Sequence, residues 1–280
     1  MPTLTRSPAG PARRDRNGSP SLVNTWVKGA VGVGVLFAFL QVLSTLEIVS
    51  SAYLPSPVGV VARSFDLCTD PEFMGDLRTT LTAWLVALVI GSLVGVVLGI
   101  LLGSIPLLND LSRVAIELVR SLPAVALIPL AILLLGQSPQ MKISLAALAS
   151  TWPVMFNTIY GMQDVDPIAK ETSRAFGFGR TATVVRVSVP DAGPFIFTGI
   201  RTATALGLVV IVATEFFVIG SGGVGAWMIL AQSGGGSEGA RDVLAATVII
   251  GLIGVVANAA LSAVEARAFA WHESQRVVGG

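Results

Sequence analysis

Hydrophobic and polar positions follow one another along the chain in long blocks. Six apolar blocks each approach the roughly 20 residues that a helix needs to cross the hydrocarbon of a bilayer. They cover about residues 29–49, 79–103, 121–138, 141–160, 192–219 and 243–265. This pattern predicts an all-α integral membrane protein with six transmembrane helices.

The second block carries a regular stripe of glycines. Gly91, Gly95, Gly99 and Gly103 recur at every fourth position and therefore share one face of a helix. Small residues in this arrangement let another helix approach closely. We expect the stripe to pack against a neighbouring helix of the same bundle, and a seam between two copies of the chain is the alternative.

The composition agrees with a membrane protein. The chain is 53% hydrophobic and 12% charged, whereas soluble domains average about 25% charged residues. The single cysteine, Cys68, excludes an intramolecular disulfide, and the single histidine, His272, excludes a Cys/His zinc site. We therefore expect no metal, cofactor or catalytic group on this chain.

Both ends of the chain are polar. Residues 1–28 are rich in Pro, Arg, Ser and Gly, which predicts a disordered basic tail, and residues 266–280 form a C-terminal tail. The apolar block at 29–49 is longer than the roughly 7–15 residues of a signal-peptide core, so we interpret it as a retained span. A signal peptide cut near Ala52 is the alternative. Residues 29–265 then form one transmembrane domain.

Lysine and arginine are distributed unequally between the two sides. If the N-terminus is inside, 13 of the 18 cations fall on inner segments and 4 on outer ones, and Arg201 lies within the fifth block. Cytoplasmic segments of membrane proteins carry such an excess. The asymmetry predicts that both termini are cytoplasmic, that 104–120 and 161–189 are inner loops, and that Lys142 lies outside.

The inner loop at 161–189 contains signals for a helical hairpin. Asp166 and Pro167 are typical of a helix start, and Gly177 stands where a left-handed helix end is expected. A second short helix is predicted at about 180–187, and Pro190 is expected to break the chain before the fifth span.

The first helix of this hairpin is predicted to have one mainly apolar face. Ile168, Thr172, Ala175 and Phe176 fall on it, while Glu171 lies on another face. Such a surface outside the membrane suits docking into a groove of another protein. A hairpin that only connects two spans, with Glu171 paired to Arg174, is the alternative.

The same loop resembles a known family motif. Glu171, Gly177, Val187 and the Val189-Pro190 pair have the spacing of the EAA motif of ABC-importer permeases, which reads Glu-Ala-Ala, three residues, Gly, nine residues, Ile, any residue, Leu-Pro. This chain has Thr-Ser in place of Ala-Ala and valine in place of Ile and Leu. LPSP at 54–57, and the stretches 117–136 and 214–228, resemble the branch that serves nitrate, taurine and aliphatic sulfonates.

The resemblance implies the permease subunit of an ATP-driven importer that depends on an extracytoplasmic binding protein. It implies a homodimer in the cell membrane, with two cytoplasmic ATPases that hold ATP and Mg²⁺. The implied ATPase-docking residues of the coupling helix are Glu171, Ala175, Phe176, Gly177 and Pro190. The chain itself has no Walker motif, since GSGGVG at 220–225 is not followed by Gly-Lys-Ser/Thr, so it is not expected to be an enzyme.

Four residues of the apolar blocks are candidates for the translocation path or a gate. Pro123 and Pro129 interrupt the third block, and proline in a span often marks a kink that lines a cavity. Arg201 and Glu215 are ionisable groups in the fifth block, where burial is costly. They lie about 21 Å apart along a helix, so no direct pair is expected. We expect Glu215 near the outer end as a partly hydrated gate or structural residue, and Arg201 near the inner surface.

Two other functions remain as alternatives. A secondary transporter driven by an ion gradient needs carboxylates near mid-depth and often an internal repeat, and the sequence shows no repeat. A membrane-embedded enzyme needs a cluster of catalytic groups within the spans. The residues do not identify the substrate; a sulfonate, taurine or nitrate is favoured by the resemblance alone.

Overall fold

The structure is a computed structural model that describes residues 22–47 and 50–269, and all regular structure in this part is helical. The long helices are α1 (Leu22–Thr45), α3 (Pro71–Ser104), α6 (Pro139–Asp164), α10 (Gly193–Phe217) and α12 (Gly236–Ala268). The shorter elements are α2 (Pro57–Leu67), α4 (Pro106–Arg120), the 3-10 turn η1 (Ala124–Leu127), α5 (Ile128–Leu135), α7 (Pro167–Ala175), α8 (Arg180–Thr183), the π turn η2 (Val184–Ser188), α9 (Val189–Asp191), the 3-10 turn η3 (Ile219–Ser221) and α11 (Val224–Ser233).

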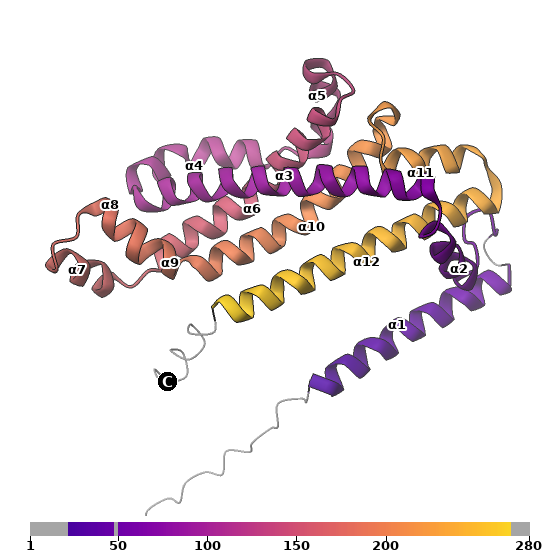
Figure 1. Cartoon of the computed structure of the whole chain (residues 1–280), viewed down its shortest axis with the longest axis horizontal. Coiled ribbons are helices and arrows are strands. Elements are labelled where there is room, and N and C mark those ends of the chain that lie inside the picture. Colours follow the sequence, from indigo (N-terminus) through magenta and orange to yellow (C-terminus); the bar gives the residue numbers. More distant parts are fainter. Residues whose placement is uncertain (1–21, 48–49, 270–280) are drawn as a thin grey trace, which may run out of the picture.

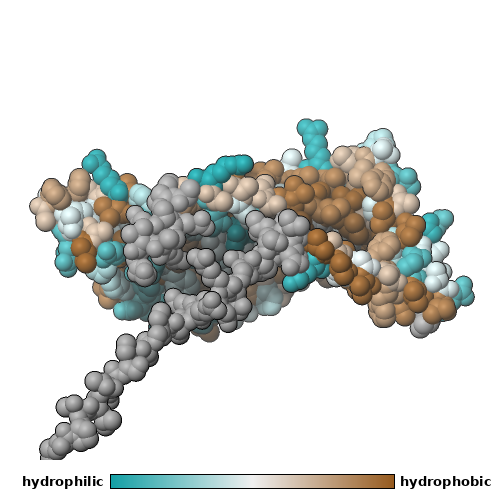
Figure 2. Space-filling model, turned by 90° about the horizontal axis from the view of Figure 1, so that it is seen from below, coloured by the Kyte–Doolittle hydropathy of each residue, from teal (hydrophilic) through white to brown (hydrophobic). Residues whose placement is uncertain are grey.

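The long helices run along one axis of the molecule (Figure 1). The short helices α7 and α8 lie at one end of this axis, and α2 and α11 lie near the other. In Figure 2, hydrophobic side chains form a large patch over the right-hand half of the visible face, while hydrophilic ones appear at both ends and also between them.

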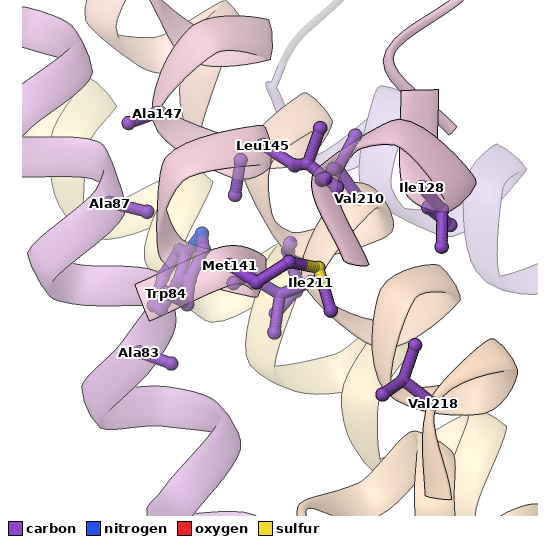
Figure 3. Packing of buried hydrophobic residues seen from close by; sticks show 13 residues of the cluster. Ala83, Trp84, Ala87, Ile128, Met141, Leu145, Ala147, Val210, Ile211 and Val218 are labelled. Atoms are coloured by element: carbon purple, nitrogen blue, oxygen red, sulfur yellow. The ribbon is translucent and has the colours of Figure 1, made fainter. Parts of the chain in front are cut away.

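The centre of the bundle is α6, which packs against both α3 and α10. Trp84, Met141 and Ile211 come from these three helices and meet in the hydrophobic core shown in Figure 3. The indole Nε1 of Trp84 donates a hydrogen bond of 3.0 Å to the carbonyl oxygen of Thr204, so α3 and α10 are also joined by a polar contact. A buried indole N–H normally requires such a partner.

The glycine stripe of α3 faces α6 within the same chain. A Cβ atom built on Gly91 would lie 2.6 Å from the carbonyl oxygen of Ala147, and one on Gly103 would lie 2.6 Å from Cβ of Met162. No side chain fits at such separations. The prediction that the stripe packs inside the bundle is confirmed, and the alternative of a seam between two copies is wrong.

At the end opposite α7 and α8, α2 is joined to α12 by an ion pair. Nε of Arg63 lies 2.6 Å from Oδ1 of Asp242. The hydrogen bond to this carboxylate raises the pKa of Arg63 above its already high ordinary value.

Four helices are long and apolar enough to span a membrane: α1, α3, α10 and α12. A fifth candidate is the pair of α4 with η1 and α5, which is bent by 76° at residues 121–123. Helix α6 has 26 residues, or about 39 Å at 1.5 Å per residue, but it carries Lys142 and many polar residues. The structure therefore supports four or five spans, while six spans and cytoplasmic termini remain predictions.

Several predicted boundaries were wrong. Residues 22–28 belong to α1 rather than to a tail, and the rest of the predicted N-terminal tail lies outside the described residues. The predicted loop 104–120 is almost entirely the amphipathic helix α4, which was missed because its charged face interrupts the apolar pattern. The predicted third span at 121–138 is not one helix.

The prolines explain the break in the third block. Pro123 precedes η1 in extended conformation, and Pro129 lies in the first turn of α5. The missing N–H and the fixed φ of proline oppose a continuous helix through these positions. The predicted interruption is therefore confirmed, and its role in a path is treated below as a proposal.

Candidate functional site

The predicted hairpin forms at one end of the bundle from α7, α8, η2 and α9; we call residues 165–191 the hairpin (Figure 1). Helix α7 begins where Asp166 accepts a hydrogen bond of 2.8 Å from the backbone N–H of Ile168. It ends at Ala175 and is closed by Gly177, whose φ is +84°. The N–H groups of Gly177 and Phe178 donate to the carbonyls of Arg174 and Ser173, which is a Schellman ending. The predicted start and end of this helix are confirmed.

The second half of the hairpin differs from the prediction at Pro190. This proline lies in the first turn of α9, directly after the π turn η2, and the helical path continues through it. Proline is tolerated there because the first N–H groups of a helix need no partner. The path is interrupted instead at Ala192, before α10. The predicted break at Pro190 was therefore displaced by two residues.

One face of α7 holds the hairpin together and to the bundle. The hydroxyls of Ser173 and Thr183 are buried and lie 2.9 Å apart, joining α7 to α8. The ammonium group of Lys170 donates a hydrogen bond of 3.1 Å to the carbonyl oxygen of Met162, near the end of α6. The face of α7 that is turned towards the bundle therefore fixes the hairpin to α6.

The opposite face of α7 is not covered by any of the described residues. Phe176 is 81% exposed and Ile168 is 69% exposed. Thr172 and Ala175 are also exposed, as the predicted common face requires. Glu171 is exposed too, and the structure describes no ion pair between it and Arg174. The hairpin therefore presents an unpaired carboxylate beside an apolar face.

A second constellation lies within the bundle, and the sequence did not reveal it. Lys142 of α6 and Glu215 of α10 are fully buried, and Nζ of Lys142 lies 2.6 Å from Oε1 of Glu215. Glu215 also accepts a hydrogen bond of 2.7 Å from the hydroxyl of Thr80 on α3. The sequence analysis assigned Lys142 to an outer segment, which stays a prediction. It expected Glu215 to be partly hydrated, which is wrong because the side chain of Glu215 is fully buried.

The loop after α10 completes this constellation. The ammonium group of Lys142 donates to the carbonyl oxygens of Ser221 and Gly222 at 3.2 and 3.0 Å. The backbone N–H of Gly225 donates to Glu215, and that of Gly223 donates to Asp76 at 2.8 Å. We call Asp76, Thr80, Lys142, Glu215 and the backbone of 221–225 the buried cluster.

The buried cluster leaves no space for a side chain on its loop. Gly223 has φ of +107°, and a Cβ atom there would collide with the carboxylate of Glu215. Both charges are matched by each other and by further hydrogen bonds, which is the condition under which a buried pair is tolerated. The arrangement clamps α3, α6, α10 and the start of α11 together.

Arg201, the other ionisable residue of α10, has a separate partner. Its Nη1 lies 3.1 Å from Oε2 of Glu265 on α12 and 3.3 Å from the hydroxyl of Ser262. The prediction that Arg201 and Glu215 do not pair directly is confirmed. The arginine is 38% exposed, so it is neither buried in the core nor extended alone towards the surface.

Comparisons with known proteins identify related membrane proteins. Residues 91–269 match the family described as binding-protein-dependent transport system inner membrane component. Taurine transport system permease protein TauC of Escherichia coli is 28% identical over 250 residues, covering 86% of this chain and 90% of TauC. Nitrate import permease protein NrtB of Synechocystis is 27% identical over 239 residues, covering 82% of this chain and 84% of NrtB.

A third relative is more similar over a shorter stretch. SsuC of Escherichia coli, whose name describes an aliphatic sulfonates transport permease, is 34% identical over 193 residues, covering 68% of this chain and 72% of SsuC. The family match covers more than half of the chain and includes the hairpin, the buried cluster from Lys142 onwards and α12. The chain therefore belongs to the family of inner membrane components of binding-protein-dependent transport systems and is a multi-pass permease of the ABC transporter class.

Proposed function

We propose that this chain is the permease subunit of an ATP-driven importer and that the hairpin couples it to a cytoplasmic ATPase. The observation that carries the proposal is the exposed face of α7. It places Phe176 and Ile168 outward at one end of a spanning bundle, beside a motif with the spacing of the EAA motif. An apolar helix face of this kind docks into grooves of partner proteins.

The contacts of the hairpin suggest how it would transmit force. Glu171, Ala175, Phe176 and Gly177 face the ATPase in this proposal, while Ser173 and Lys170 anchor α7 to α8 and α6. Pro190 lies in α9, directly before the spanning helix α10. Movement of the docked helix would therefore reach two central helices, α6 and α10, through short packed connections.

The names of three relatives guide the choice of substrate and partners. They concern nitrate, taurine and aliphatic sulfonates, which share a small oxyanion group. We therefore propose a small anion as substrate, delivered by an extracytoplasmic binding protein to a permease built from two copies of this chain. ATP and Mg²⁺ belong to the ATPase subunits, and both termini and the hairpin lie in the cytoplasm.

The candidate path residues divide into two groups. Arg201 and the break marked by Pro123 and Pro129 are proposed to line or shape the path, because Arg201 is partly exposed and the break bends the chain by 76°. Glu215 is proposed as a structural clamp next to an outer gate formed by residues 218–224, since its carboxylate is fully engaged. An engaged, buried carboxylate is also poorly placed to carry protons or sodium in a gradient-driven cycle.

The decisive experiment is a pulldown of the tagged chain from gently solubilised native membranes, with partners identified by mass spectrometry. Gly177→Asp tests the hairpin, because aspartate tolerates a left-handed backbone and adds a charge to the docking turn. Gly75→Asp, in the first turns of α3, is the matched control, since a Cβ atom meets nothing within 4 Å at either glycine.

We expect the wild type and Gly75→Asp to retain an ATPase and a binding protein, and Gly177→Asp to lose the ATPase while it remains inserted. An ATPase retained equally by all three proteins would contradict the role of the hairpin. If no ATPase is recovered and uptake in cells collapses with an uncoupler but persists without ATP, the importer proposal is wrong and a secondary transporter replaces it.

A further inference from the structure

A pocket of about 430 Å³ lies between the hairpin and the ends of the spanning helices. Ser104, at the end of α3, and Met162, near the end of α6, form part of its wall on the bundle side. Lys170, Arg174 and Arg180 line it from the hairpin side. Its volume falls within the roughly 300–1,000 Å³ of typical small-molecule sites.

The charges around this pocket have one sign. Three cations line it, and no carboxylate is among its lining residues. In the described part of the chain, none of Lys170, Arg174 and Arg180 takes part in an ion pair. Cations that converge without a carboxylate repel one another, and a bound anion removes this repulsion.

An unsatisfied hydroxyl points to the same ligand chemistry. The Oγ atom of Ser104 is shielded from solvent and has no hydrogen-bond partner among the described residues. A buried hydroxyl without a partner costs free energy, and most such groups in proteins are satisfied. Ser104 lines the same pocket as the three cations, so an acceptor bound beside them could also accept from its hydroxyl once this side chain turns towards the pocket.

We propose that this pocket binds a tetrahedral oxyanion of the phosphate or sulfonate type. Guanidinium groups match such oxygens in two-point hydrogen bonds, and a lysine and a hydroxyl supply further donors. The pocket lies where α3 and α6 end. If these helix ends reach the membrane surface, a lipid headgroup can also occupy it, since basic pockets at that depth bind anionic lipids. The headgroup phosphate of a lipid and a free oxyanion present the same chemistry.

The bound group would act as a brace. It would join Ser104 of α3 to the cations of α7 and α8, a connection that the described side chains do not make directly. This inference concerns the chain alone and does not depend on the hairpin binding an ATPase. It predicts that the hairpin becomes more firmly attached to the bundle when the anion is present.

The test measures the melting temperature of the full chain, purified and delipidated in a neutral detergent, as a function of added anion. Inorganic phosphate is titrated against chloride at constant ionic strength, and phosphatidylglycerol is titrated against phosphatidylcholine in mixed micelles. The test variant is Arg174→Gln with Arg180→Gln; both arginines are exposed, so we expect this variant to fold. Arg186→Gln is the matched control, an exposed hairpin arginine outside the pocket lining.

We expect the anion to raise the melting temperature of the wild type and of Arg186→Gln in a saturable way. In the double variant, the anion concentration at half-maximal stabilisation should rise at least about tenfold, since hydrogen bonds to charged groups are lost. Ser104→Ala should shift it by about two- to tenfold, as expected for one hydrogen bond. A response to both probes identifies a free oxyanion as sufficient, and a response to phosphatidylglycerol alone identifies a lipid. The proposal is overturned if neither probe stabilises the wild type. It is also overturned if Arg186→Gln weakens the stabilisation by the anion as much as the double variant does.

Discussion

The hairpin and the buried cluster handle charge in opposite ways. In the buried cluster, Lys142 and Glu215 are removed from solvent and matched by each other and by hydrogen bonds with three further elements. In the hairpin, Glu171, Arg174 and Arg180 are exposed, and the described residues offer them no ion pair. The first arrangement is complete within one chain, whereas the second leaves donors, a carboxylate and an apolar face available to other molecules.

This difference has a physical consequence for how each region responds to change. A buried charge that loses its partner cannot be solvated, so the cluster resists opening and substitution. Local stability also follows the number of buried contacts, which is low for the outward face of α7. We therefore expect mutations of the cluster to act on folding, and mutations of the hairpin to act mainly on binding.

The largest expected effect comes from Lys142→Met, which leaves the carboxylate of Glu215 buried and uncompensated. Breaking such a pair costs about 3–5 kcal/mol, a large fraction of the roughly 5–15 kcal/mol that stabilises a typical domain. We expect little monodisperse protein after detergent extraction, measured by fluorescence-detected size exclusion.

Two double variants control this prediction. Lys142→Met with Glu215→Gln removes both charges and should recover much of the folded protein. Lys142→Glu with Glu215→Lys restores a pair but should not recover it, because the carbonyls of Ser221 and Gly222 face position 142 and favour a cation. A single Lys142→Met variant that melts like the wild type would show that the ion pair is dispensable.

The next effect contrasts two glycines with a left-handed backbone. Gly223 in the buried cluster and Gly177 in the hairpin have φ of +107° and +84°. Alanine at either position is strained, by about 1–3 kcal/mol, and Gly223, with ψ of 173°, lies in a region that is open essentially to glycine alone. At Gly223 its Cβ also collides with the carboxylate of Glu215, whereas at Gly177 it meets nothing within 4 Å.

Melting temperatures should therefore fall much further for Gly223→Ala than for Gly177→Ala. Gly75→Ala, in a helix and without neighbours within 4 Å, serves as the unstrained control and should not lower the melting temperature. Equal losses at Gly223 and Gly177 would mean that the collision with Glu215 adds nothing and that the cluster loop can move aside.

The same contrast explains what could be predicted from the sequence. The start and end of α7 depend on neighbours in the sequence: Asp166 caps the N–H of Ile168, and Gly177 closes the helix onto Arg174 and Ser173. Such signals can be identified directly from the chain. In the buried cluster, Thr80 and Lys142 are 135 and 73 residues away from Glu215 in the sequence, so no local sequence pattern predicts these contacts.

A weaker signal for the cluster was present. Lys142 stands at the edge of an apolar block, and a cation there requires a partner or an exit to water. The sequence analysis counted it with the outer segments, because it stands only one residue inside the predicted block at 141–160, whereas α6 starts at Pro139. Helix α4 was missed for a related reason, since its hydrophobic positions repeat at helical spacing rather than as a continuous run.

A smaller effect is expected at the joint between the two halves of the hairpin. Ser173→Ala removes the hydrogen bond to Thr183 and leaves that buried hydroxyl without it, at a cost of about 1 kcal/mol. Amide hydrogen exchange of residues 166–190 should become several-fold faster while the rest of the bundle is unchanged. Thr181→Ala, at an exposed position of α8, is the control and should leave exchange unaltered. A global rather than local increase would show that the hairpin unfolds with the bundle.

The smallest effect on stability is expected at the centre of the outward face. Phe176→Asp alters a side chain that is 81% exposed. The free energy of unfolding of the permease alone should therefore stay within about 0.5 kcal/mol of the wild-type value. ATPase retention in a pulldown should nevertheless be lost, because a charge enters the proposed apolar contact. Phe65→Asp is the matched control, since Phe65 is 72% exposed on α2 at the opposite end, and it should retain the ATPase. A large loss of stability would place Phe176 in a contact with a second copy of the chain, and full retention of the ATPase would reduce the hairpin to a connection between spans.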